Sequence, residues 1–182
     1  MSLPAWAAAL AAAGVPAVQL REKDLGDRAC FEMLRLLRAA LPASRLFANG
    51  RADIAVAAGA DGVHLPADGV PTAALRARFG RELLLGRSTH TVDEVEREAA
   101  SGADYVTFGP VFATSGKGAP VGLGALADAA SHGVPVLALG GVGLAELPRV
   151  AAAGAAGAAG IRLFQDLERL SDVVAAARVA FT

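Results

Sequence analysis

The chain has 182 residues, of which 54% are hydrophobic, and its 17 Lys and Arg residues are nearly balanced by 18 Asp and Glu residues. This length predicts one domain over residues 1–182 with a substantial buried core. Because the basic residues are scattered, we expect no nucleic-acid partner. The weakly charged stretch 118–146 is interrupted by proline and glycine, so we expect no membrane span of about 20 apolar residues. Cys30 is the only cysteine, which excludes an internal disulfide and is typical of a soluble, cytoplasmic protein.

The chain begins with an alanine-rich stretch, 1–14, that lacks the basic segment of a signal peptide and predicts a helix. A pattern then recurs: a segment ends in small residues, a glycine follows, and a short apolar run comes next. Glycine just after a helix adopts the left-handed conformation that closes the helix, and an apolar run without alternation suits a strand buried on both faces. The runs predict strands at 18–21, 62–65, 105–108, 136–139 and 158–161.

Two further strands are predicted at 45–49 and 83–87, which makes seven, and Thr91 with Glu94 predicts the capping box of a following helix. Strands that alternate with helices build either a closed TIM-type (β/α) barrel or an open doubly wound sheet. No Gly-x-Gly-x-x-Gly sequence follows any of the predicted strands, which argues against a dinucleotide-binding open sheet. We therefore expect an α/β fold of the TIM-type (β/α) barrel class.

Polar side chains gather at the carboxyl ends of the predicted strands and directly after them, where (β/α) barrels carry their chemistry. These residues are Gln19, Arg21, Glu22, Lys23, Asn49, Arg51, His64, Arg87, Ser88, Thr89, His90, Thr114, Ser115 and Lys117. We expect Arg21, Lys23 and Lys117 to converge on one anion, which predicts a phosphorylated substrate. Each of these cations taken alone is more simply explained as solvated surface charge.

Glycine-containing turns follow the last two predicted strands, at Gly140-Gly141 and at Gly160-Ile161. Barrels commonly bind a phosphate there through backbone N–H groups and the start of a short extra helix, and glycine lets the backbone approach the oxygens closely. A plain tight turn is the alternative interpretation of either sequence. Arg162 comes next, and it either adds charge to the phosphate site or closes the site with an ion pair.

Three histidines are candidates for titration near neutral pH. His64 alternates with apolar neighbours, so it is either a packed structural residue or a catalytic one. His90 follows a predicted strand and is a candidate proton carrier. His132 precedes a strand, at the opposite end of the predicted barrel, and we interpret it as structural.

Several segments, in order, resemble those of the thiamine phosphate synthase/TenI family. They are residues 18–24, 49–53, 60–65, 86–90, 109–117 and 139–142. Because their order and spacing are specific, the chain is identified by resemblance as a member of this family. The resemblance implies a TIM-type (β/α) barrel and a place in thiamine biosynthesis. The family normally has a strand before the first helix, and that strand is missing from this sequence. Members of the family often form dimers, so a homodimer is an open alternative.

In this family, synthases join a pyrimidine pyrophosphate to a thiazole phosphate as pyrophosphate departs with magnesium. The resemblance implies one set of residues around the pyrimidine and the pyrophosphate. These are Gln19, Arg21, Lys23, Asn49, Ser88 and Lys117. It implies that Thr114 lines the loop that covers this pocket. It implies a second set that holds the thiazole phosphate, Gly140, Gly141, Ile161 and Arg162, next to Gly160 of the predicted turn.

The sequence departs from the synthases where these bind magnesium. Their two aspartate ligands correspond to Gly50 and Gly69, and their glycine-glutamine pair is Pro66-Ala67 in this chain. Without these carboxylates, the ion that neutralises a departing pyrophosphate is poorly held. Asp68 is one residue away and is a candidate weak ligand. We therefore expect no cofactor, with magnesium required only if the chain is a synthase.

The TenI branch keeps the thiazole phosphate site and includes a tautomerase that needs no metal. A metal-independent thiazole tautomerase, an isomerase whose small-molecule partner is a thiazole phosphate, is therefore the favoured interpretation. The proton-carrying histidine of that branch corresponds to Pro110 here. The catalytic candidates are His64, His90, Glu22 and Lys117. The alternatives are a thiamine phosphate synthase, which is a transferase, and a non-catalytic protein that binds a thiamine precursor.

Overall fold

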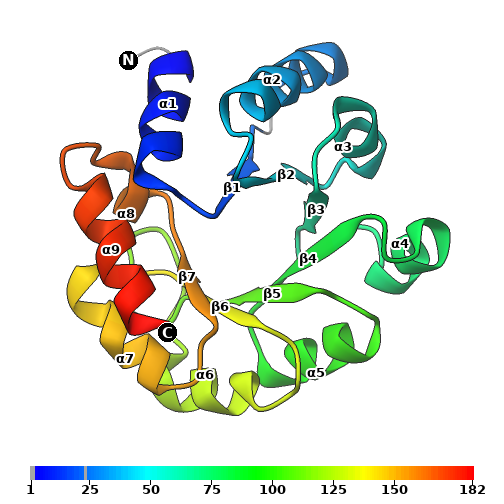
Figure 1. Ribbon diagram of the computed structural model, residues 1–182. Helices are drawn as coiled ribbons and strands as arrows, with labels where there is room; N and C mark the ends of the chain where they lie inside the picture. The colour runs from blue at the N-terminus through cyan, green and yellow to red at the C-terminus, as the bar shows by residue number, and fades with distance from the viewer. Residues whose placement is uncertain (1–2, 23) are drawn as a thin grey trace. The chain divides into compact units, whose positions relative to one another are not determined.

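The computed structural model describes residues 3–22 and 24–182, and its helices and strands alternate along the chain (Figure 1). The strands follow one another in the sheet in sequence order, β1 to β7, and the paired strands run parallel. This arrangement confirms the predicted α/β class. The chain divides into two compact units, Met1–Leu85 and Gly86–Thr182. No described helix is both long enough and apolar enough to cross a membrane.

The first unit contains three strands and the start of a fourth, each preceded by a helix. Its elements are α1 (Leu3–Ala13), β1 (Ala17–Leu20), α2 (Asp27–Ala40), β2 (Arg45–Asn49), α3 (Ala52–Ala58), β3 (Gly62–Leu65), α4 (Thr72–Phe79) and the start of β4 (Leu84–Thr89). Gln19 is level with Phe47, and Asn49 is level with His64. Because residues two apart on a strand share a face, Gln19, Asn49 and His64 lie on the same face of the sheet. Gly62 gives the Phe47 ring room there, since a Cβ at Gly62 would lie 2.6 Å from Phe47 Cε1.

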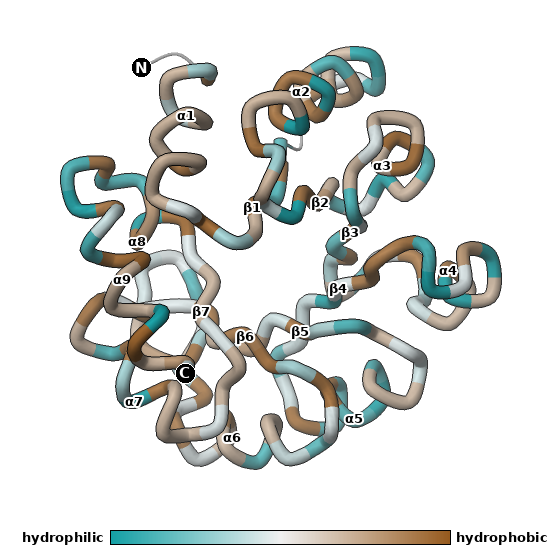
Figure 2. The backbone as a smooth tube through the Cα atoms, viewed as in Figure 1, coloured by the Kyte–Doolittle hydropathy of each residue, from teal (hydrophilic) through white to brown (hydrophobic). Residues whose placement is uncertain are grey.

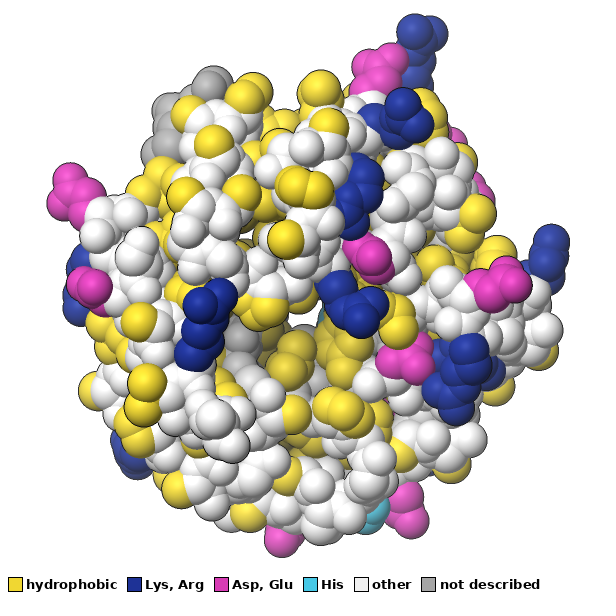
Figure 3. Space-filling view, viewed as in Figure 1, with side chains coloured by type: hydrophobic (Ala, Val, Ile, Leu, Met, Phe, Trp, Pro, Cys, Tyr) yellow, Lys and Arg dark blue, Asp and Glu magenta, His cyan; other side chains and the backbone are white. Residues whose placement is uncertain are grey.

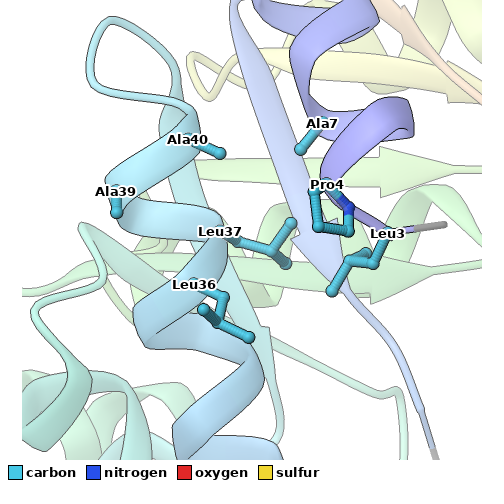
Figure 4. Close-up of a pocket in the computed structure, with 7 residues that line it drawn as sticks. All are labelled: Leu3, Pro4, Ala7, Leu36, Leu37, Ala39 and Ala40. Carbon is cyan, nitrogen blue, oxygen red and sulfur yellow. The ribbon is translucent and has the colours of Figure 1, made fainter.

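Helices α1 and α2 lie side by side in the first unit and differ in character (Figure 2). Helix α1 is apolar along its length, whereas α2 alternates charged and apolar residues. Between them runs an apolar groove of about 300 Å³ (Figure 4). Its lining residues are Leu3, Pro4, Ala7, Leu36, Leu37, Ala39 and Ala40. This lining offers no polar side chain, so the groove is not a candidate catalytic site.

The second unit contains the rest of β4 and three further strands. Its elements are α5 (Val92–Ala100), β5 (Tyr105–Phe108), α6 (Gly122–Ala130), β6 (Val136–Leu139), η1 (Leu144–Glu146), α7 (Leu147–Ala152), β7 (Gly157–Ala159), α8 (Arg162–Gln165) and α9 (Leu170–Ala180). Val106 and Phe108 of β5 are fully buried in one cluster with Val95 of α5 and Leu126 of α6. Because successive strand residues point to opposite faces, the residues between them face away from these helices.

The predicted strands agree with the structure at β2, β3, β5 and β6, and those at β1 and β4 are displaced by one or two residues. The prediction of a last strand over 158–161 is wrong at its end. Strand β7 spans Gly157–Ala159, and Gly160 and Ile161 lie beyond it. The small residues there carry too little hydrophobic pattern to fix a strand end.

Two local predictions are confirmed. The glycines predicted to close helices all have positive φ angles. They are Gly14, Gly59, Gly102, Gly133 and Gly154. The capping box of α5 is also present, because the Thr91 side chain accepts from the Glu94 backbone and the Glu94 side chain accepts from the Thr91 backbone.

Candidate active site at the strand ends

Gln19 and Asn49 form a pair at the ends of β1 and β2. The Gln19 amide nitrogen Nε2 donates to Asn49 Oδ1 over 2.9 Å, and both side chains are half-buried. The neighbouring Gly50 N–H donates to the carbonyl oxygen of His64 over 2.9 Å. The side chain of His64 is buried, as the packed interpretation predicts. This pair leaves amide hydrogens and one amide oxygen to recognise a polar ring.

The loop after β1 contributes Arg21 and Glu22, which are both exposed, while Lys23 lies outside the described residues. The predicted convergence of Arg21, Lys23 and Lys117 on one anion therefore stays a prediction. Arg21 supplies one positive charge near the end of β1.

Arg51 is held at the start of α3 by two aspartates, a role that the sequence did not reveal. Its guanidinium pairs with Asp27 at the start of α2 and, over 3.1 Å, with Asp53. The hydrogen bond from Arg51 lowers the pKa of both carboxyl groups from their usual values. Asp27 is far in sequence, so only the Arg51–Asp53 spacing of two residues offered a signal.

Of the three positions considered for magnesium, 50, 68 and 69, only Asp68 carries a carboxylate. Within residues 3–22 and 24–182, no three His, Cys, Asp or Glu side chains are grouped so that they could hold a metal ion. Asp68 is exposed, and Gly50 and Gly69 provide no carboxylate. Gly50 also has a φ of +72°, a conformation in which side chains are rare.

In the second unit, His90 follows β4, and hydrogen bonds fix both its ring and its backbone. The His90 Nδ1 atom lies 2.6 Å from the carbonyl oxygen of Gly109, and the backbone N–H of His90 donates to Glu94 Oε2 over 2.6 Å. A carbonyl oxygen can only accept, so Nδ1 carries the hydrogen in this contact. In the neutral ring, Nε2 then has a free lone pair and can accept a proton.

The segment after β5 lies directly on the Gly140-Gly141 turn after β6. The Val111 N–H donates to the carbonyl oxygen of Leu139 over 2.9 Å, and the Phe112 N–H donates to the carbonyl oxygen of Gly140 over 3.0 Å. Both glycines have positive φ angles, of +92° and +67°. A Cβ on Gly141 would also lie 2.7 Å from Phe112 Cβ. Glycine is therefore required at this turn for close backbone packing, whatever the turn binds.

Arg162 joins the loops that follow β5 and β7. Its Nη2 atom donates to Thr114 Oγ1 over 2.6 Å, and Ile161, which is 64% exposed, precedes it at the start of α8. Of the two alternatives from the sequence, an ion pair is not what this contact provides, because a threonine hydroxyl is neutral. The guanidinium thus adds a positive charge beside Thr114.

Two other polar residues of this unit have different surroundings. Lys117 is exposed, in a stretch 115–120 that is exposed throughout. Arg87 is buried and pairs with Glu98 of α5 over 3.5 Å, which assigns it to the helix-facing side of β4. On the face shown in Figure 3, Lys and Arg side chains are interspersed with Asp and Glu. This face therefore shows both signs of charge side by side.

A family model described as thiamine monophosphate synthase matches residues 1–164. The chain belongs to this family. A protein of Anaeromyxobacter dehalogenans named thiamine-phosphate synthase is 44% identical over 160 residues, which are 85% of this chain and 72% of that protein. A Geobacter sulfurreducens protein, whose name gives the same activity provisionally, is 47% identical over 154 residues, which are 81% of this chain and 72% of that protein.

The fold of the thiamine monophosphate synthase family is found in a solved structure. Thiamine phosphate pyrophosphorylase from Pyrococcus furiosus matches with a TM-score of 0.88, over 100% of this chain and 92% of that chain, at 24% sequence identity. This likeness confirms the predicted TIM-type (β/α) barrel class, with the seven strands of this chain.

Proposed function

We propose that the chain is a thiamine phosphate synthase, a transferase that joins a pyrimidine pyrophosphate to a thiazole phosphate. The observation that carries the proposal is the contact of three loops in the second unit. Segment 109–114 lies on the Gly140-Gly141 turn, and Arg162 donates to Thr114. The name of the relative at 44% identity supports this activity and favours it over the tautomerase expected from the sequence.

In the proposed reaction, the thiazole nitrogen forms a bond to the pyrimidine methylene carbon. The bond from that carbon to oxygen breaks, and pyrophosphate leaves with both electrons of the bond. The chain binds and orients the two substrates and favours the separation of charge. The paired amides of Gln19 and Asn49 suit the hydrogen-bonding edge of an aminopyrimidine.

The phosphate groups require donors and positive charge. The Gly140-Gly141 turn and Arg162 suit a phosphate monoester, because backbone N–H groups and a guanidinium both donate to its oxygens. Lys117, on the exposed stretch 115–120, suits the departing pyrophosphate as a mobile point charge. Arg21 supplies a further cation after β1. Ser88 and Ile161 are included among the proposed binding residues because the family resemblance implies them.

The proposal is tested by incubating the purified chain with both substrates over a range of magnesium concentrations and measuring thiamine phosphate by chromatography. We expect product formation, and we expect Lys117→Ala to lower kcat/KM at least about tenfold. Arg45→Ala is the matched control, since Arg45 is an exposed cation at the opposite end of β2 and its loss should not change the rate. Absence of product at every magnesium concentration would sink the synthase assignment.

A thiazole tautomerase is the second candidate, and one observation favours it. The ring of His90 is held on the Gly109 carbonyl, next to Pro110, with Nε2 available to carry a proton. Incubation with the thiazole phosphate carboxylate alone tests this activity. Isomerisation that disappears in His90→Asn, without any need for the pyrimidine substrate, would favour the tautomerase over the transferase.

A further inference from the structure

Thr107 of β5 carries a hydroxyl group with no hydrogen-bond partner in the described part of the chain. The side chain is 6% exposed, and its Oγ1 atom is buried without a donor or an acceptor. The backbone of the same residue is satisfied, because its carbonyl oxygen accepts from Thr89 Oγ1 over 3.0 Å. A buried hydroxyl without a partner is unfavourable, and a valine would fill the same space without that penalty.

The face on which this hydroxyl lies is the one turned away from the helices of the second unit. The neighbours of Thr107 on the strand, Val106 and Phe108, belong to the cluster formed with α5 and α6. Tyr105 shares the Thr107 face, and a Cβ on Gly86 of β4 would lie 2.1 Å from its ring atom Cζ. Two residues farther along, Ser88 is level with Thr107. The side chains of Ser88 and Thr107 are thus adjacent on this face.

Apolar and small residues continue the row on the other side of Thr107. Thr107 is level with Leu137 of β6, and Leu137 is level with Gly157 of β7. Leu137 and Leu139 are only half-buried, although both are leucines on a central strand. This part of the face therefore suits a flat, mostly apolar group that carries one hydrogen-bonding atom, rather than a charged phosphate.

The same face leads to the Gly140-Gly141 turn. Leu137 lies three residues before Gly140, which corresponds to about 10 Å of extended strand. A phosphate at the turn and a ring beside Thr107 can therefore belong to one small molecule.

We propose that the Thr107 hydroxyl is a substrate-binding group that hydrogen-bonds the heteroaromatic ring of a phosphate monoester whose phosphate binds at Gly140-Gly141. This inference rests on the proposed function and identifies the thiazole phosphate as the substrate concerned. A threonine hydroxyl both donates and accepts, so it can pair with a ring nitrogen or with a polar ring substituent.

The test compares Thr107→Val, which keeps the shape and removes the hydroxyl, with Thr107→Ser, which keeps the hydroxyl. Dissociation constants for thiazole phosphate are measured by calorimetry, and stability is measured by urea unfolding. We expect Thr107→Val to weaken binding about five- to tenfold without lowering stability, and Thr107→Ser to bind like the unmodified chain. Thr89→Val is the contrasting control: its hydroxyl has a partner within the chain, so its loss should lower stability.

Equal affinity in the unmodified chain and Thr107→Val would overturn the inference, and so would an effect confined to the pyrimidine pyrophosphate. If Thr107→Val does not fold, Thr107→Ala provides the same comparison. The binding measurement does not depend on turnover. If the unmodified chain forms no thiamine phosphate but Thr107→Val weakens thiazole phosphate binding, the proposed function is wrong and the role of Thr107 still holds. If the unmodified chain binds no thiazole phosphate, the role of Thr107 is wrong as well.

Discussion

The His90 ring donates from Nδ1 to the carbonyl oxygen of Gly109 over 2.6 Å. This hydrogen bond connects the end of β4 to the end of β5. Gly109 begins the segment that packs on the Gly140-Gly141 turn through Val111 and Phe112. His90 is thus linked to the proposed phosphate site through the segment that Gly109 begins. The sequence had presented it only as a candidate proton carrier. Its ring can act by positioning this segment or by transferring a proton.

Substitution of His90 separates these roles. We expect His90→Ala to raise the KM for thiazole phosphate about fivefold in the joining reaction, because the Gly109 carbonyl loses a hydrogen bond. His90→Asn should restore most of the affinity, since its amide can donate to the same carbonyl. His132→Ala, in the turn before β6, is the control and should match the unmodified chain. If His90→Asn fails as badly as His90→Ala in kcat alone, proton transfer rather than positioning explains the residue.

Gly141 is expected to be far less tolerant of a side chain than Gly133. Both have positive φ angles, but a Cβ on Gly133 would meet nothing within 4 Å, whereas one on Gly141 would lie 2.7 Å from Phe112 Cβ. Gly133→Ala should cost about 1 kcal/mol in the free energy of unfolding, from the backbone conformation alone. Gly141→Ala should cost about 2–4 kcal/mol and weaken phosphate binding, because segment 109–113 must move. Equal losses in urea unfolding would contradict this packing argument.

The Arg162–Thr114 hydrogen bond predicts how the phosphate site responds to substitution. Arg162→Ala should weaken thiazole phosphate binding about tenfold, through the loss of a charge-assisted donor, and should reduce the dependence of binding on salt. Arg169→Ala, a nearby exposed cation in the sequence, is the control. Crystals soaked in phosphate should show the anion at Gly140-Gly141 and Gly160-Ile161. Tighter binding by Arg162→Ala would mean that this side chain blocks the site.

The loop that carries Lys117 is expected to be mobile until substrate binds. Residues 115–120 are exposed. The segment before them is hydrogen-bonded to β6, and after them the Val121 N–H donates to the carbonyl oxygen of Pro110 over 2.8 Å. Hydrogen exchange should therefore be fast within 115–120 and slow on either side. Addition of thiazole phosphate with pyrophosphate should slow it. Protection of 115–120 in the unliganded chain would count against a covering role.

The sequence predicted most of the scaffold because the apolar runs and the glycines after helices repeat at each strand. It placed Gln19 and Asn49 at neighbouring strand ends, and the structure joins them by a hydrogen bond. It could not predict that Thr107 lacks a partner, because satisfaction of a hydroxyl depends on neighbouring strands rather than on its own segment. It likewise missed the link between Arg51 and Asp27, which are distant in sequence.

Tyr105 predicts a loss of stability at alkaline pH. Burial raises the pKa of its hydroxyl above the usual value of about 10. The folded state therefore favours the neutral hydroxyl: this stability is fully present below about pH 10 and is lost as the pH rises toward the higher folded pKa. Tyr105 is the only tyrosine in the sequence, so tyrosinate absorbance reports on it alone. Tyr105→Phe should reduce the alkaline loss in urea unfolding, while Cys30, whose pKa burial also raises, still contributes to it. An ordinary absorbance titration midpoint would contradict the prediction.

Restoring two carboxylates is expected to strengthen magnesium-dependent synthesis. The unmodified chain should bind thiazole phosphate without metal, because the glycine turn and Arg162 need only an anion, but it should form thiamine phosphate slowly. Gly50→Asp with Gly69→Asp adds the missing ligands beside Asp68, and we expect half-maximal rate at a magnesium concentration at least about tenfold lower. Strain is the competing effect, since Gly50 has a φ of +72° and a Cβ on Gly69 would lie 3.0 Å from the Pro66 ring.

Gly59→Asp controls for that strain, because Gly59 also has a φ of +72°. Gly59 follows α3 and precedes β3, whereas Gly69 comes after β3, so an aspartate at 59 lies at the opposite end of this strand. Aspartate tolerates this conformation better than most residues, so both the control and the double variant should fold, as urea unfolding would show. The control should leave the magnesium dependence unchanged. If the unmodified chain already works fast at low magnesium and the double variant adds nothing, the ion is held by groups other than those at positions 50, 68 and 69.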